Sequence, residues 1–234
     1  MGNNRWYKSW PRDHVQGAST SKNDYKKKTF RANERDLEKN KKRREDFKAE
    51  LETIHIKKRI YIDESGTNLG MSRTHGRSAA GERAYAKRPG IRGGNISLVG
   101  AIRLDEEPTL YPFDGPVDED RFLSFLDRLI PSLNDGDVVI MDNCSIHKTE
   151  SVKVKLATVG ARPLFLPPYS PELNPVEEAW SLAKSIFKRL EARTISAYID
   201  VLGSAKAAIT PEKIEAYFKH SDSFLNLKEE ALLT

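Results

Sequence analysis

Apolar and polar positions follow three different patterns along this chain of 234 residues. Residues 1–30 show no periodicity and carry a run of lysines at 26–28, so we interpret them as a disordered basic segment. Residues 31–57 are rich in Glu, Lys and Arg, with a sparse apolar stripe that predicts a charged, mostly exposed linker helix. From residue 58 to 234, short β-branched runs alternate with helical spacings, which predicts one folded domain.

This third region has the pattern of an α/β domain. Runs rich in β-branched and aromatic residues predict five strands, at residues 59–63, 84–88, 95–104, 137–141 and 162–166. Helical spacing of apolar residues predicts helices at 118–130, 148–158 and 175–190, with further helices towards the C-terminus. Turns are expected at 63–66 and at 135–136. The order β-β-β-α-β-α-β-α predicts a mixed five-stranded sheet flanked by helices.

The charge of the chain is unevenly distributed. The formal net charge is +5, but residues 1–59 carry +9 and the remainder carries −4. A basic arm on a slightly acidic body fits a protein that grips phosphate with one part and binds cations with the other, although such arms also occur as solvated tails. The single cysteine, Cys144, the polar N-terminus and the lack of a long apolar run favour a cytoplasmic protein.

Three acidic residues stand at the edges of predicted elements. Asp63 ends the first strand, Asp142 ends the fourth, and Glu177 lies in the first turn of the helix at 175–190. If the strand ends meet at one edge of the sheet, the carboxylates repel one another unless a divalent cation such as Mg²⁺ or Mn²⁺ binds between them. Each residue also fits a purely structural role in a turn or at a helix start. The pattern alone leaves both metal binding and this structural role open.

The sequences around these acids resemble the three acidic motifs of the Tc/mariner superfamily of DDE transposases, in particular bacterial insertion-sequence members. Residues 61–66 read Tyr-Ile-Asp-Glu-Ser-Gly, and residues 139–148 read Val-Ile-Met-Asp-Asn-Cys-Ser-Ile-His-Lys. A long proline motif, Leu-Pro-Pro-Tyr-Ser-Pro-Glu-Leu-Asn-Pro-Val-Glu, ends at Glu177, with 34 residues between Asp142 and that glutamate. The resemblance implies a ribonuclease-H-like catalytic domain at residues 58–234, in which Asp63, Asp142 and Glu177 hold metal.

The resemblance also implies a reaction and partners. Family members hydrolyse DNA at transposon ends and then join the freed 3′-hydroxyl to target DNA. The resemblance also implies that two Mg²⁺ or Mn²⁺ ions take part in this reaction. A homodimer on DNA is expected by the same analogy. The family usually carries helix-turn-helix domains ahead of the catalytic domain, and residues 1–58 show no such pattern. We therefore expect the DNA-reading half to be encoded separately or to be lost.

Other side chains have supporting roles in this interpretation. Asn143 and His147 follow Asp142 in one loop, where they would touch DNA phosphate or orient a metal ligand. A basic stretch between the first and third predicted strands would track the DNA backbone, or would only be a solvated hairpin; its members include Arg73, Arg77, Arg83, Lys87, Arg88 and Arg92. Asn174 is expected to cap the following helix.

Two other functions remain open at the level of sequence. One is a catalytically silent, DNA-binding remnant of a transposase, favoured by the missing DNA-reading domain. The other is a ribonuclease-H-like nuclease such as a junction resolvase, against which the proline motif and its spacing speak. An active, metal-dependent transposase domain is the function that the motifs favour.

Overall fold

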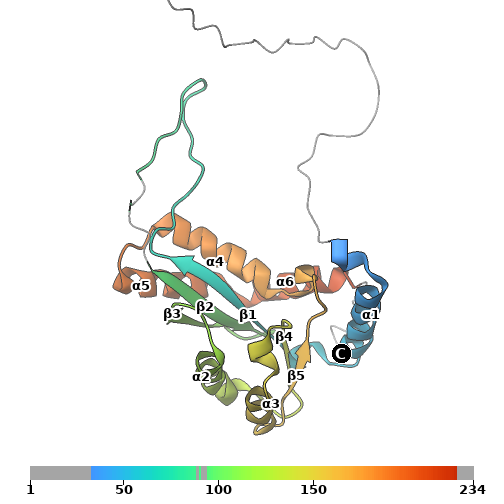
Figure 1. Cartoon of the computed structure of the whole chain (residues 1–234). Coiled ribbons are helices and arrows are strands. Elements are labelled where there is room, and N and C mark those ends of the chain that lie inside the picture. The colour runs from blue at the N-terminus through green and yellow to red at the C-terminus, as the bar shows by residue number, and fades with distance from the viewer. Residues whose placement is uncertain (1–32, 88–89, 91–93, 226–234) are drawn as a thin grey trace, which may run out of the picture. The chain divides into compact units, whose positions relative to one another are not determined.

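Five strands form one mixed sheet in the order β3-β2-β1-β4-β5 (Figure 1). β1, β2 and β3 pair antiparallel, whereas β1, β4 and β5 pair parallel. The predicted α/β class with a mixed five-stranded sheet is confirmed. The strands are β1 (Arg59–Asn68), β2 (Asn95–Ile102), β3 (Thr109–Asp114), β4 (Val138–Met141) and β5 (Arg162–Phe165).

The computed structural model describes residues 33–87, 90 and 94–225. The segment predicted to be disordered, 1–30, and two of the predicted DNA-contact residues, Arg88 and Arg92, lie outside these described residues. No helix of the described part is long and apolar enough to cross a membrane.

Helices cover both faces of the sheet, as Figure 1 shows, and each face has its own apolar core. On one face lie α2 (Glu119–Leu129) and α3 (Glu150–Ala157), which bury Phe122, Phe125 and Leu156. On the other lie α4 (Val176–Leu190), α5 (Ile195–Ala208) and α6 (Pro211–Ser223). Short 3₁₀ helices occupy Asn33–Asp36, Ile56–Lys58, Ile130–Ser132, Ser145–Lys148 and Pro171–Leu173.

The charged helix α1 (Glu38–Glu52) belongs to the larger core rather than standing apart from it. Phe47 and Leu51 of this helix are buried in the α4 side of the molecule. The buried Arg59 completes the connection, because its guanidinium donates to the carbonyls of Leu51 and Ile54 at 2.9 and 3.0 Å. The same group pairs with Asp222 of α6 at 3.2 Å. One arginine thus satisfies the C-terminal end of α1 and ties α1, β1 and α6 together.

Two local predictions were wrong. The expected strand at 84–88 is absent, since the described residues 84–87 have no strand structure; the third strand of the sheet is β3 instead. The expected turn at 63–66 is also absent, because β1 runs straight through to Asn68 and pairs with β2 along its whole second half. Cross-strand pairing over eight residues outweighs the turn preference of Asp, Ser and Gly. Asp63 therefore lies within β1, opposite Gly100.

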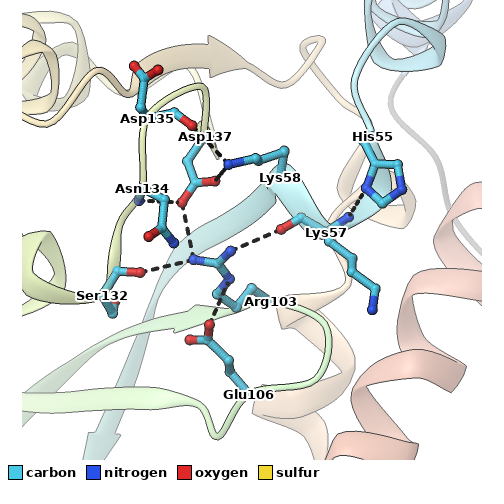
Figure 2. A network of polar contacts seen from close by, with 9 residues as sticks. All are labelled: His55, Lys57, Lys58, Arg103, Glu106, Ser132, Asn134, Asp135 and Asp137. Carbon is cyan, nitrogen blue, oxygen red and sulfur yellow. Dashed lines mark hydrogen bonds and ion pairs between the residues drawn. The ribbon is translucent and has the colours of Figure 1, made fainter.

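A polar network closes the end of the sheet at which β1 and β4 begin and β2 ends (Figure 2). Asp137 is fully buried there. Its Oδ2 accepts from the Asn134 amide at 2.8 Å and from Arg103 Nη1 at 3.1 Å, and its Oδ1 lies 3.3 Å from Lys58 Nζ. Two cations thus surround one buried carboxylate. The outer contacts of the network involve Ser132, Asp135, Glu106 and the carbonyl of Lys57.

Candidate metal centre

Asp63, Asp142 and Glu177 line one cavity of about 310 Å³. The strand register brings the two aspartates together, because β1 and β4 are parallel neighbours with Tyr61 opposite Ile140. Two residues further along each strand stand Asp63 and Asp142, at the same level and on the same face. Glu177 reaches the cavity from the first turn of α4.

The proline motif forms the wall between the strands and α4. Residues 166–171 line the cavity, and their backbone is held to the strand edge by the amide of Leu166, which donates to Met141 at 2.7 Å. Asn143 donates its side-chain amide to the carbonyl of Leu166. At the other end, Asn174 Oδ1 accepts from the Val176 amide at 3.2 Å, although the residue directly before α4 is Pro175 and not the predicted Asn174. These contacts fix where α4 begins and hence where Glu177 stands.

Gly100 and Trp180 determine how closely α4 lies against the sheet. Trp180, one turn beyond Glu177, is buried with its ring over Gly100. A β-carbon at position 100 would stand 2.6 Å from the indole ring and 2.8 Å from Leu110. Only glycine leaves room for the ring, which makes this contact between α4 and β2 a condition for the position of Glu177.

Asp63 is held in an environment that disfavours its charge. Burial, together with the negative charges of Glu177 and Asp142, raises the pKa of Asp63 to about 7, although the amide of Glu64 and the nearby indole of Trp180 act in the opposite direction. Its Oδ2 is buried without a hydrogen-bond partner among the described residues, and so is Trp180 Nε1. The indole therefore lies near the carboxylate without the geometry of a hydrogen bond.

Asp142 has a different environment, created by His147. The ring of His147 is 3% exposed, and its Nδ1 lies 2.8 Å from Asp142 Oδ1 while its Nε2 lies 3.2 Å from Glu64 Oε1. Burial alone would lower the pKa of His147, but the two carboxylates outweigh it and raise the pKa to about 9. The hydrogen bond between His147 and Asp142 lowers the pKa of Asp142. The Cys144 amide also donates to Asp142 Oδ1, at 2.8 Å.

The cavity fits a divalent cation in charge and in ligand type. Its lining contains three carboxylates and no Lys, Arg or His, and one carboxylate oxygen is buried and unpaired. Hard oxygen ligands of this kind suit Mg²⁺ or Mn²⁺. In the described part of the chain, however, no three His, Cys, Asp or Glu side chains are gathered closely enough to hold an ion as they stand.

The structure separates the predicted DNA-contact residues into three groups. Asn143 is exposed beside the cavity, whereas His147 is buried with both ring nitrogens in contact with carboxylates, which favours an orienting role over a DNA contact. Arg73, Arg77 and Lys87 are exposed in the irregular segment that follows β1.

Sequence reasoning missed three features of the centre. Glu64 faces away from Asp63 on β1, yet it is linked to Asp142 through His147. The Gly100–Trp180 contact was also missed, as was the approach of Lys188 and Arg189 to Arg73. A Gly in the interior of an apolar strand was the available signal for the second of these.

Comparison with known proteins agrees with this geometry. The family model described as "DDE superfamily endonuclease" matches residues 58–199. The structure of the "Mos1 transposase paired-end complex with left transposon end" is similar with a TM-score of 0.67 at 17% identity, over 86% of this chain and 65% of that one. The "catalytic domain of Mos1 mariner transposase" is similar with a TM-score of 0.59 at 14% identity, over 83% of this chain and 93% of that one. No curated protein matches.

The fold is therefore the ribonuclease-H-like fold of a mariner transposase catalytic domain, with carboxylates from β1, the end of β4 and the start of α4 at one cavity. This chain belongs to the DDE superfamily endonucleases. The resemblance found in the sequence is confirmed at that level. The chain spans about 65% of the length of the Mos1 chain in the paired-end complex.

Proposed function

We propose that this chain is the catalytic domain of an insertion-sequence transposase, which cleaves DNA strands at the element's ends and transfers them to target DNA in a divalent-metal-dependent reaction. The observation that carries the proposal is the cavity that Asp63, Asp142 and Glu177 line together, without a basic side chain. Family membership supports the strand-cleaving part, and the likeness to Mos1 supports the transposase part.

In this proposal Asp63, Asp142 and Glu177 hold two ions of Mg²⁺ or Mn²⁺. Bound ions would supply the positive charge that activates an attacking oxygen and stabilises the leaving oxygen of a phosphodiester. The protein's own contribution is positioning. His147 holds Oδ1 of Asp142, which leaves the other oxygen of that carboxylate turned away from these contacts. Trp180 and the proline wall keep Glu177 at the cavity that the two aspartates also line.

The proposed partner is DNA. Structures similar to this chain include Mos1 complexes with a transposon end, a strand transfer complex, and paired-end complexes with Mn and with Mg. The part of the Mos1 chain that this chain does not match leaves room for a separate end-reading domain. We propose that such a partner, and pairing of two copies on DNA, complete the active assembly.

A matched pair of variants on one helix turn tests the proposal. Supercoiled plasmid that carries the element's ends would be incubated with Mn²⁺ and with the wild-type chain, Glu177→Gln or Glu178→Gln. Glu178 points away from the cavity and contacts His220. We expect Glu177→Gln to lose at least about 100-fold of the nicking rate, and Glu178→Gln to retain it.

Absence of Mn²⁺-dependent nicking by a folded wild-type chain, even with its end-reading partner added, would overturn the proposal. Equal nicking by Glu177→Gln and the wild type would also overturn it. Cleavage of four-way junctions in place of element ends would identify a junction nuclease instead.

A further inference from the structure

We propose a second DNA-contact site, apart from the carboxylate cavity, which takes the phosphate backbone of duplex DNA. This basic cleft has a volume of about 410 Å³ and lies between the segment that follows β1 and the C-terminal end of α4. The inference rests on the proposed function, since it assigns the path of the substrate. The lining residues are Arg73, Thr74, His75, Ser185, Lys188 and Arg189.

The cleft is held in place by an arginine behind it. Arg193, in the turn between α4 and α5, donates through Nη1 to the carbonyls of Leu69 and Met71, both at 2.9 Å. Its Nη2 donates to Ser72 Oγ at 2.8 Å. Figure 1 shows the segment after β1 leaving the sheet beside this end of α4. The first residues of the segment are therefore anchored to the helix, and Arg73 follows directly.

Arg73, Lys188 and Arg189 of the cleft have no acidic partner among the described residues, and the cleft lining contains no carboxylate. Some exposed cations elsewhere do have partners, as in the pairs Lys41–Glu38, Lys153–Glu150 and Arg162–Glu50. A cluster of unpaired cations repels itself, and a polyanion is the ligand that relieves the repulsion.

Helix geometry connects the cleft to the carboxylates. Ser181, Lys184 and Lys188 follow Glu177 by 4, 7 and 11 residues, so they form one stripe along α4. At 1.5 Å per residue, Lys188 lies about 17 Å from Glu177 along the axis. This rise is about half a turn of duplex DNA, whose full turn is about 34 Å. Both sites therefore lie within one turn of duplex DNA, and a duplex that runs along α4 would span the carboxylates and the cleft.

The experiment measures DNA affinity without catalysis. The full chain would bind a fluorescein-labelled 30-base-pair duplex of arbitrary sequence in EDTA, over a series of salt concentrations, with anisotropy as the readout. The variant is Lys188→Gln with Arg189→Gln. The matched control is Lys153→Gln with Lys155→Gln, which removes the same charge from α3 on the other face of the sheet.

Each phosphate contact contributes about 0.9 to the slope of log K against log salt concentration. The cleft variant should lower that slope by about 1 to 2 and weaken binding about 10- to 50-fold near 0.1 M salt, whereas the control should leave the slope unchanged. Arg73→Gln, on the opposite wall, should give about half of the effect. The charge-retaining variant Lys188→Arg with Arg189→Lys should bind like the wild type.

An unchanged slope in the cleft variant, or an equal loss in the control, would overturn the inference. Its failure is distinguishable from failure of the proposed function, because binding in EDTA requires no metal. A wild type that binds through the cleft but never nicks DNA would retain this site and remove the catalytic proposal. If the wild type nicks DNA but the cleft variant binds DNA normally, the catalytic proposal would be retained and the second DNA-contact site would be removed.

Discussion

Asp137 directly precedes β4 and Asp63 lies within β1; each has a carboxylate oxygen removed from solvent, and their surroundings are opposite. Asp137 has two cations around it, Arg103 at 3.1 Å and Lys58 at 3.3 Å. Asp63 has two further carboxylates as neighbours. Among the described residues, Asp63 Oδ2 and Asp137 Oδ1 both lack a hydrogen bond, but only Asp137 Oδ1 has a cation beside it. The fold therefore neutralises one buried acid internally and leaves the other in a cluster of like charge.

This difference distinguishes a carboxylate that stabilises the fold from one whose charge is available to bind a ligand. A buried ion surrounded by counterions contributes to stability only as part of its network, because loss of one partner leaves the others unpaired. A cluster of like charges has no such benefit and costs stability until a cation arrives. The comparison thus predicts that replacing aspartate with asparagine destabilises the protein at position 137 and stabilises it at position 63.

The largest expected effect is at the neutralised site. Asp137→Asn should lower the free energy of unfolding by about 3 kcal/mol, since Arg103 and Lys58 then lose the buried anion between them and Arg103 keeps only the more exposed Glu106. For a domain of this size the melting temperature should fall by about 6–12 °C. Thermal unfolding monitored by circular dichroism measures it. A fall of less than 2 °C would mean that the network of Figure 2 contributes little.

The second prediction is a gain in stability at Asp63. Asp63→Asn removes one of three like charges, so at pH 8 and without metal it should raise the melting temperature by about 2–6 °C. The same variant should lose Mn²⁺-dependent nicking, because the carboxylate is gone. Ser65, also on β1, is the control position: Ser65→Ala should not stabilise the protein. Destabilisation by Asp63→Asn would remove the contrast between the two aspartates.

How far the sequence could predict these two sites depends on the range of the contacts. The approach of Asp63, Asp142 and Glu177 follows from parallel neighbouring strands and from a proline motif adjacent to a helix start, and the structure places all three at one cavity. Their roles as metal ligands remain predictions. The Asp137 network escaped notice because Arg103 and Lys58 come from distant segments whose register no local pattern shows.

The errors in the sheet have a similar origin. β3 was missed because Thr109–Asp114 contains Pro112, which argues against a central strand. Proline is tolerated here because β3 lies at the edge of the sheet. The extension of β1 beyond Asp63 was missed because only the partner strand β2 makes residues 63–68 extended. Both errors concern strand pairing, which is a property of the whole sheet.

The last prediction uses pH to sharpen the contrast. The pKa of Asp63 is raised to about 7, so the stability that its protonated form provides is present at low pH and is lost as pH rises through 7. A cation requires the ionised form, so its binding should be weaker at pH 5.5 than at pH 8. Mn²⁺ should therefore raise the melting temperature at least about twofold more at pH 8, as differential scanning fluorimetry would measure.

The control must allow for His147, whose pKa is raised to about 9 and whose contribution is lost as pH rises through that value. Asp63→Asn retains His147 and its contacts, so a difference between this variant and the wild type isolates Asp63. If the variant shows the same pH-dependent Mn²⁺ shift, the ion binds elsewhere. If Asp137→Asn retains the wild-type shift despite its lower melting temperature, the two aspartates act independently, as their opposite surroundings require.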